Sequence, residues 1–233
     1  MGPGRFIRKK MVKNVKIIKI GPCLRVPIER HSFVTFLTFL IVTKCSHLKM
    51  KNLNSKVICY HGEGAMDQGT FWESLNFSAL KKLPILFVCE NNGLAIYSDQ
   101  RKRMKTLDIC KKVKSFGVHT IKIKDNSTKN IFQSTQKALQ RIKKNGQPVF
   151  LEINTYREVD HVGINYDFAL GYRKKEKQKM MKSLNELNFL KQNTKNFKQI
   201  EKKINKEISD ALNYSLKSNF PHKKCIESNV TKE

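Results

Sequence analysis

Short apolar runs that alternate with helical patterns restrict the fold of this chain more than any other feature of its sequence. The runs are rich in β-branched and aromatic residues, and Gly or Pro stands near each of them: 57–60, 85–89 and 149–151. Such runs are typical of strands buried on both faces of a sheet. Ile and Lys alternate at 121–124, which predicts a half-exposed strand. Apolar residues at helical spacing fill the segments between: 71–83, 107–116 and 131–142. The alternation predicts an α/β fold, a parallel sheet with flanking helices.

Pro and Gly residues indicate where the predicted helices end. Pro84 follows the first helical segment, and Gly117 is expected to cap the second, because Gly adopts the left-handed conformation at little steric cost. Asn145 and Gly146 end the third helix, and the polar residues 125–128 supply its amino-terminal cap.

Glycines and polar residues follow two of the predicted strands. Gly62-Glu63-Gly64-Ala65 comes soon after the first strand, and Asn91-Asn92 comes after the next. Ligands of open parallel sheets bind beyond the carboxyl ends of the strands, and a right-handed crossover would make these strands neighbours. The amides of a glycine turn before a helix suit a diphosphate, and carboxylate, carboxamide and carbonyl oxygens suit Mg²⁺. We therefore predict one site for Mg²⁺ and the diphosphate tail of a cofactor.

These residues lie in a segment that resembles a known family. From Gly62 to Ser98 the chain reads GEGAMDQGTFWESLNFSALKKLPILFVCENNGLAIYS, which closely resembles the thiamine-diphosphate motif of 2-oxo acid dehydrogenase alpha subunits. Pyruvate, branched-chain and acetoin dehydrogenase alpha chains are among them. The similarity continues through Tyr156-Arg157 and His161 in TYREVDHVGINYDFALGYR and on to residues 218–221. It covers residues 49 to about 225.

The resemblance implies a thiamine-diphosphate-binding fold with a set of Mg²⁺ ligands. Glu63 and Asn92 would bind the ion through their side chains, and Leu94 would bind it through its main-chain carbonyl. The turn from Gly62 to Ala65 would contact the cofactor, with the amides of Gly64 and Ala65 near the diphosphate. Asn92 and Leu94 would complete the cofactor site.

Two further residues gain catalytic roles from the resemblance. His161 matches a loop histidine that lies near the thiazolium of the cofactor and assists acyl transfer, and Arg157 would stand beside that loop. Taken alone, His161 would be interpreted as an ordinary loop histidine. The flanking TYR and GYR residues favour the functional interpretation.

The implied activity is decarboxylation of a pyruvate-like 2-oxo acid, with transfer of the remaining acyl group to a lipoyl carrier. The implied partners are a beta subunit, in an α₂β₂ assembly, and a lipoyl acyltransferase. A non-catalytic relative that only docks a beta subunit is the alternative. A basic nucleic-acid-binding protein is a third hypothesis, which no aromatic-bearing basic motif supports.

Two departures from the family bear on activity. Glu63 is one methylene longer than the expected Asp, and Mg²⁺ demands near-octahedral geometry at about 2.0–2.1 Å, so we expect weaker cofactor binding rather than none. Residues 1–48 do not match the family and lack its Tyr-Arg pair and Gly-rich segment. The sequence leaves open a fragment or a misassigned start on one side and a genuine short protein on the other.

The organisation predicted is a basic leader with a short apolar segment at 1–48, the cofactor-binding domain at 49–172 and a helical, Lys-rich extension at 173–233. In the extension, apolar residues recur every fourth position, at Ile200, Ile204, Ile208, Leu212 and Leu216. This stripe either packs on its own domain or docks against another subunit.

The net charge of +27 over 233 residues would attract nucleic acid or an acidic partner. The lysines are scattered through every segment, however, which favours a general compositional bias. The six cysteines show no spacing suited to zinc and indicate a reducing compartment. The apolar run 33–42 is shorter than the roughly 20 residues of a membrane span. We expect a cytoplasmic protein, or one of the mitochondrial matrix if the acid-free segment 1–28 is a transit peptide.

Overall fold

The computed structural model places the chain in two compact units, residues 1–184 and 185–233, each considered by itself. Residues 1–41, which include the basic leader and all of the apolar run 33–42 except its last residue, lie outside the described residues, as does the junction 174–185. The domain limits expected at residues 48 and 172 stay predictions. The structure describes residues 42, 45, 46, 49, 50, 56–125, 127–163, 165–173 and 186–220.

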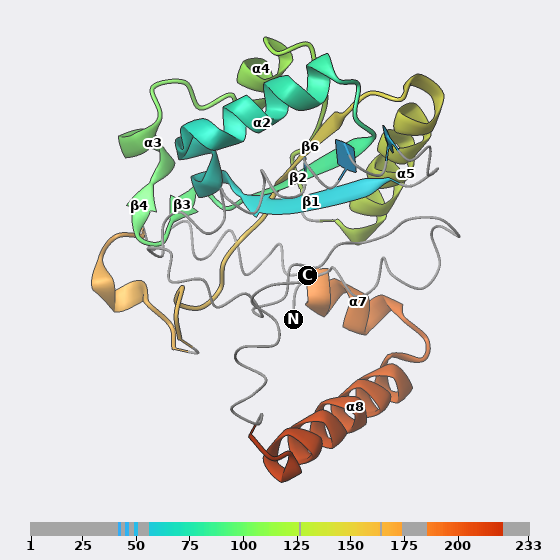
Figure 1. Ribbon diagram of the computed structural model, residues 1–233. Coiled ribbons are helices and arrows are strands. Elements are labelled where there is room, and N and C mark those ends of the chain that lie inside the picture. The colour runs from blue at the N-terminus through green and yellow to red at the C-terminus, as the bar shows by residue number, and fades with distance from the viewer. Residues whose placement is uncertain are drawn as a thin grey trace. The chain divides into compact units, whose positions relative to one another are not determined.

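A parallel sheet forms the centre of the first unit (Figure 1). Its strands lie in the order β1-β2-β6-β5, and every neighbouring pair is parallel. The strands are β1 (Val57–Gly62), β2 (Ile85–Asn91), β6 (Val149–Asn154) and β5 (His119–Ile123). This arrangement confirms the predicted α/β class and the predicted adjacency of the first two strands.

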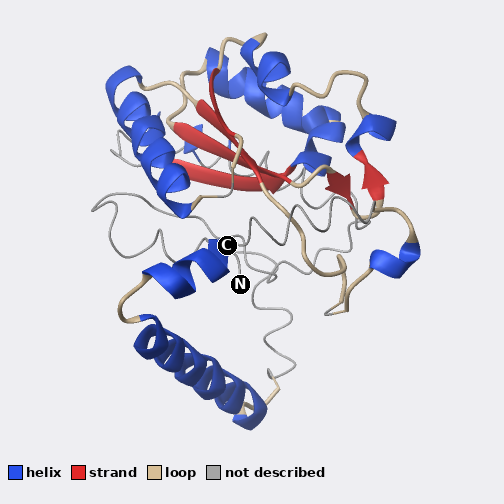
Figure 2. Cartoon of the chain, turned by 180° about the vertical axis from the view of Figure 1, so that it is seen from behind, coloured by secondary structure: helices blue, strands red, loops and turns tan. Residues whose placement is uncertain are grey.

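Helices cover both faces of this sheet, as the two views in Figures 1 and 2 show. Helices α2 (Gly69–Leu80) and α4 (Ile109–Lys114) lie on one face, and α5 (Thr128–Asn145) lies on the other. Shorter elements lie at the end of the sheet where β1 and β2 finish. They are η2 (Glu63–Asp67), β3 (Leu94–Ala95), β4 (Ser98–Asp99) and α3 (Gln100–Arg103), with η3 (Phe168–Leu170) further along the chain.

Alternate residues of the strands build two separate cores. Cys59, Phe87 and Phe150 belong to the core under α2 and α4, whereas Leu86 and Leu151 belong to the core under α5. This division follows from the two-residue period of a strand, which sends successive side chains to opposite faces. Each fully buried Leu, Ile or Phe side chain contributes about 1.5–3 kcal/mol relative to its exposed state. The continuous apolar runs of the sequence are thus explained by burial on both faces.

Two helices are shorter than the sequence pattern predicts. Helix α2 ends at Leu80, because Lys82 adopts a positive φ of 50° and the chain turns towards β2. Helix α4 begins at Ile109, because the Asp108 side chain accepts a hydrogen bond from the Lys111 amide at 3.0 Å. Leu83, Leu107 and Phe116 therefore lie outside the helices, and Ser115 rather than Gly117 is the terminal cap. Gly117 has the expected positive φ, 75°, but in the turn that follows.

The second unit contains α7 (Glu186–Asn193) and α8 (Phe197–Lys217), so the Lys-rich C-terminal region is helical as predicted where the structure describes it. Helix α8 carries the apolar stripe, with Ile200 and Ile204 about two-fifths exposed (43% and 41%). The two roles predicted for this stripe, packing on its own domain or docking against another subunit, both stay predictions.

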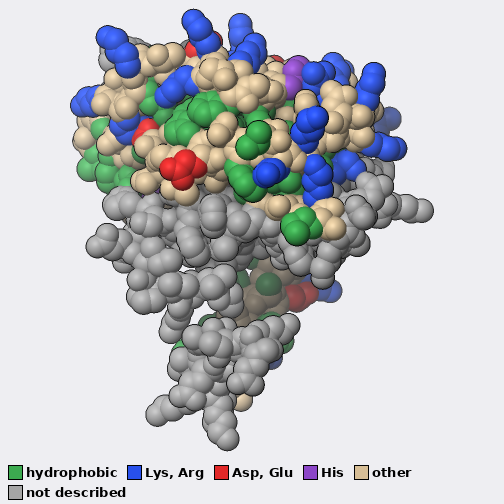
Figure 3. All heavy atoms as spheres, turned by 45° about the horizontal axis from the view of Figure 1, so that its top comes forward, with side chains coloured by type: hydrophobic (Ala, Val, Ile, Leu, Met, Phe, Trp, Pro, Cys, Tyr) green, Lys and Arg blue, Asp and Glu red, His purple; other side chains and the backbone are tan. Residues whose placement is uncertain are grey.

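Charge on the described surface is scattered. On the face drawn in Figure 3, Lys and Arg side chains project from many points among apolar and uncharged ones, and few acids accompany them. This distribution resembles the dispersed lysines of the sequence more than one basic stripe. Within the described residues, no helix is both long enough and apolar enough to pass through a membrane.

Gly146 provides a test of the helix end predicted from sequence. It caps α5 with φ 66°, a conformation that costs a residue with a Cβ atom about 1–2 kcal/mol. We predict that Gly146→Ala lowers the free energy of unfolding by about that amount. The measurement is urea unfolding followed by the fluorescence of Trp72, the single tryptophan, which packs in the first unit against Phe116.

Gly69→Ala is the matched control. Gly69 begins α2, and a Cβ atom built there meets no atom within 4 Å. Its replacement should leave stability unchanged or slightly higher, because Ala favours helix more than Gly. Equal stabilities for the two variants would contradict the assigned role of Gly146.

Candidate active site

The glycine turn lies directly at the end of β1. Gly62 is the last residue of that strand, and η2 begins at Glu63. Gly64 lies against the β3 hairpin so closely that a Cβ atom built on it would come 2.9 Å from the Cβ of Ala95. Beyond Gly62 the space is open, since the nearest atom to a built Cβ is the Glu90 carbonyl oxygen at 4.0 Å. Gly64 is therefore required by packing, whereas Gly62 leaves its main chain accessible.

The loop after β2 is fixed by its own side chains. The Asn91 Oδ1 atom accepts a hydrogen bond from the Gly93 amide at 2.9 Å, and the Asn92 Oδ1 atom accepts one from the Leu94 amide at 2.9 Å. Such Asx turns hold a loop in one conformation. Gly93 has φ 76°, which suits a glycine. The carboxamide of Asn92 and the carbonyl of Leu94 thus belong to a preorganised loop.

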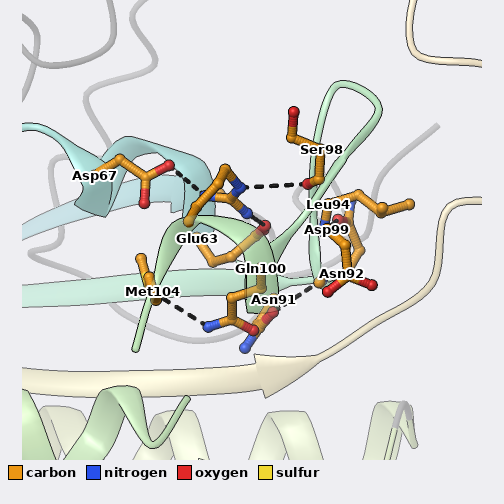
Figure 4. Close-up of polar contacts among 12 residues, drawn as sticks. Glu63, Asp67, Asn91, Asn92, Leu94, Ser98, Asp99, Gln100 and Met104 are labelled. Carbon is orange, nitrogen blue, oxygen red and sulfur yellow. Dashed lines mark hydrogen bonds and ion pairs between the residues drawn. The ribbon is translucent and has the colours of Figure 1, made fainter. Parts of the chain in front are cut away.

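A buried acid and its partner link the turn to α3. Glu63 is 1% exposed, and its Oε1 atom accepts a hydrogen bond from Arg103 Nη2 at 2.7 Å. The same guanidinium donates to the carboxylate of Asp67 and, through Nε, to the Ser98 carbonyl at 3.3 Å. Dashed lines in Figure 4 mark these contacts around Glu63, Asp67 and Ser98. One arginine therefore joins η2, β4 and α3.

Burial raises the pKa of Glu63 above its ordinary value, and the Arg103 guanidinium and the main-chain amide of Glu63 oppose that shift. A buried carboxylate is stable as an anion only when such partners compensate for lost hydration. Arg103 therefore helps to keep an acid charged at the tip of β1.

A second buried acid supports the loop after β2 from the neighbouring strand. Glu152 on β6 is fully buried, and its Oε1 atom accepts hydrogen bonds from Asn91 Nδ2 at 2.9 Å and Lys122 Nζ at 3.1 Å. Burial and this carboxylate raise the pKa of Cys110 to about 12, so the thiol stays protonated and donates to Glu152 at 3.2 Å. Asn91 thereby connects Glu152 to the Gly93 amide.

The loop after β6 is fastened to the same hairpin. Arg157 Nη1 donates to the Ile96 carbonyl at 2.8 Å, and the Tyr97 hydroxyl donates to Asp160 Oδ1 at 3.0 Å. Arg157 also contacts the buried Asp167 at 3.3 Å. His161 follows Asp160 and is exposed. The predicted catalytic segment therefore contacts the β3–β4 hairpin, which carries Leu94, through Arg157 and Asp160.

Sequence reasoning placed the turn and the two loops correctly but missed several residues that hold them. Asn91 was part of the noted Asn pair, yet its role came only from its contact with Glu152. Arg103 and Asp67 gave no signal, because charged residues beside a loop are common in this chain. A buried Glu within the apolar run of β6 was the single available hint, at Glu152.

The residues present fit Mg²⁺ and a diphosphate in chemical kind. A buried carboxylate, a carboxamide oxygen and a main-chain carbonyl are hard oxygen donors, and main-chain amides of the turn, which opens the short 3₁₀ helix η2 ahead of α2, suit a diphosphate. Within the described part of the chain, no three His, Cys, Asp or Glu side chains are grouped to hold a metal ion. The predicted set instead depends on one acid, Glu63.

The first unit is a parallel α/β fold with a glycine turn and an asparagine loop at the ends of adjacent strands. Proteins with such sheets bind their ligands beyond the carboxyl ends of the strands. The profile of the dehydrogenase E1 component family matches residues 41–224. The chain belongs to this family.

The matches to individual relatives differ in how much of this chain, and how much of the relative, they span. The human mitochondrial 2-oxoisovalerate dehydrogenase subunit alpha is 34% identical over 113 residues, which are 48% of this chain and 25% of the relative. The pyruvate dehydrogenase E1 component subunit alpha of Rickettsia bellii is 23% identical over 190 residues, 78% of this chain and 57% of the relative. The chain thus spans between a quarter and somewhat over half the length of these relatives.

Among solved structures, the chain is similar to a Mycobacterium smegmatis protein for which thiamin diphosphate dependence has been suggested. The TM-score is 0.43 and the identity 25%, over 52% of this chain and 22% of that one. At this TM-score the likeness adds nothing to the functional argument.

Gly64 offers a direct test of the packing of the turn. We predict that Gly64→Ala lowers the thermal unfolding temperature, because two Cβ atoms at 2.9 Å force the turn away from β3. Gly62→Ala is the control, since its built Cβ has no neighbour closer than 4.0 Å. Differential scanning calorimetry measures both. A Gly64→Ala protein as stable as Gly62→Ala would contradict the close packing.

Asn91 tests the link between the two strands. Asn91→Ala removes the acceptor of the Gly93 amide and one donor to Glu152, so we predict a loss of about 1–3 kcal/mol in the free energy of unfolding. Asn130→Ala removes only an exposed hydrogen bond to Asp125 and should cost little. Urea unfolding read by Trp72 fluorescence compares them. A loss no larger than that of the control would show that the contact with Glu152 is dispensable.

Proposed function

We propose that the chain acts as an alpha subunit, or as part of one, in a thiamine-diphosphate-dependent 2-oxo acid dehydrogenase. The proposed reaction decarboxylates a small, pyruvate-like 2-oxo acid and passes the acyl group to a lipoyl carrier. One observation carries the proposal. The turn at Gly62–Ala65 and the loop at Asn91–Asn92 begin at the ends of adjacent parallel strands, where Gly62 lies opposite Glu90.

In this proposal each element at the sheet edge holds one part of the cofactor. Glu63, Asn92 and the Leu94 carbonyl would hold Mg²⁺, and the amides of the turn from Gly62 to Ala65 would contact the diphosphate. When bound, thiamine diphosphate supplies the electron sink for decarboxylation. The chain itself supplies position and charge: Arg103 opposes the rise in the pKa of Glu63 that burial causes, and Asn91 fixes the loop that bears the other two ligands.

The loop after β6 supplies the proposed catalytic groups. Arg157 fixes the loop to the Ile96 carbonyl, and His161 lies exposed on it, free to meet a substrate or a partner. We propose that His161 assists acyl transfer to the lipoyl group. A buried histidine could not reach a carrier that arrives from solvent.

The proposed partners are a beta subunit, in an α₂β₂ assembly, and a lipoyl acyltransferase. The named relatives are subunits of dehydrogenases, which supports an assembly with other chains. The apolar stripe of α8 is a candidate for one such contact. The compartment stays a prediction: the cytoplasm, or the mitochondrial matrix if the N-terminal segment is a transit peptide.

A non-catalytic relative that only docks a beta subunit is the second candidate. It is favoured by the internal contacts of the ligand atoms: Glu63 already pairs with Arg103, and Asn92 already accepts from the Leu94 amide. A subunit with such self-satisfied groups would keep its fold without a cofactor.

Cofactor titration separates these two functions. The chain is co-produced with the beta subunit of a 2-oxo acid dehydrogenase, and thiamine diphosphate is titrated calorimetrically with and without Mg²⁺. We predict Mg²⁺-dependent binding and decarboxylation of a 2-oxo acid. Glu63→Gln should weaken binding by more than the roughly 10–100-fold that loss of an outer ligand partner costs.

Glu73→Gln on the exposed surface of α2 is the matched control and should bind as the unmodified chain does. Binding without decarboxylation would favour the docking relative. No binding by the original chain, and none restored by Glu63→Asp, would overturn the enzymatic proposal.

A further inference from the structure

Arg103 makes contacts that its position in the sequence does not explain. It ends the short helix α3, and its guanidinium donates to Glu63 at 2.7 Å, to Asp67, and through Nε to the Ser98 carbonyl at 3.3 Å. The side chain of Arg103 is 14% exposed, so water competes little for these bonds. By contrast Arg101, on the same helix, pairs with Asp99 while 67% exposed.

These contacts restrict the Glu63 carboxylate in a specific way. Arg103 Nη2 binds Oε1 and leaves Oε2 outside the contact. A planar guanidinium fixes the direction of its bonds, whereas an ammonium group on a flexible stem does not. Because Glu has one more rotatable bond than Asp, a carboxylate that must meet a metal with strict geometry gains more from such a constraint.

The charges of the cluster are compatible with a cation nearby. The cluster holds one guanidinium and two carboxyl groups, since Arg103 contacts both Glu63 and Asp67. Both acids belong to η2, and the second arm of the guanidinium contacts Asp67, so Arg103 is shared between Glu63 and Asp67. Acidic groups therefore outnumber basic ones in the cluster, and the guanidinium does not serve Glu63 alone.

We propose that Arg103 is a positioning residue for Glu63: by holding Oε1, it orients the carboxylate so that Oε2 serves as the Mg²⁺ ligand. Asp67 acts through Arg103 by holding the guanidinium in place. The inference rests on the proposed function, because it presumes a metal at Glu63. It explains how a longer acid serves at this turn.

The test uses Mn²⁺ as a paramagnetic substitute for Mg²⁺, titrated into the chain–beta complex with saturating thiamine diphosphate and followed by electron paramagnetic resonance. Arg103→Gln should weaken Mn²⁺ binding about 10–100-fold, the usual cost of losing an outer partner of a metal ligand. Arg103→Lys should restore part of the affinity, and Arg101→Gln should match the original chain. The zero-field splitting of the bound ion should change in Arg103→Gln, which a purely structural role would not produce.

Equal or tighter Mn²⁺ binding by Arg103→Gln would overturn the inference, since it would mean that the guanidinium is neutral towards the ion or competes with it. If that variant fails to fold, Asp67→Asn provides the test: a smaller loss of affinity is expected, and unchanged affinity overturns the inference. Absence of Mn²⁺ binding in the original complex would overturn the proposed function as well. The two failures are therefore distinguishable.

Discussion

Parallel pairing of β1 with β2 is the constraint on which the remaining structure depends. Because the strands run in the same direction, both finish at the same edge, and Gly62 lies opposite Glu90. The glycine turn and the asparagine loop then start side by side. An antiparallel pair would send them to opposite edges. The turn that carries Glu63 and the loop with Asn92 and Leu94 lie next to each other because of this pairing, whatever ligand they bind.

Two kinds of contact hold the edge in place. Core packing fixes the strands: Phe87 and Leu86 point into different cores, so a one-residue slip would place each in the wrong one. Polar contacts then fix the loops, with Glu152 supporting Asn91 from β6 and Arg103 supporting Glu63 from α3. Each of these acids is buried, so each requires its partner. The strands therefore fix the position of the site, and contacts of charged side chains hold its loops in place.

Most of the fold was predictable, because apolar periodicity and glycine positions depend on neighbours in sequence. The strand adjacent to Pro84 and the cap at Gly146 are examples. The late start of α4, at Ile109, was not predicted, since a capping side chain at Asp108 outweighed the apolar spacing. The contact of Arg103 with Glu63 joins residues 40 positions apart. No local pattern indicates such a pair, because it depends on the fold bringing α3, which carries Arg103, to η2.

The central claim is that the edge formed by β1 and β2 holds a magnesium ion and a diphosphate. Anomalous diffraction from crystals of the chain with its beta subunit, grown with Mn²⁺ and thiamine diphosphate, tests it most directly. We expect an anomalous peak that contacts the Glu63 and Asn92 side chains and the Leu94 carbonyl. A peak at other residues, or Glu63 bound to Arg103 alone with the cofactor present elsewhere, would contradict it.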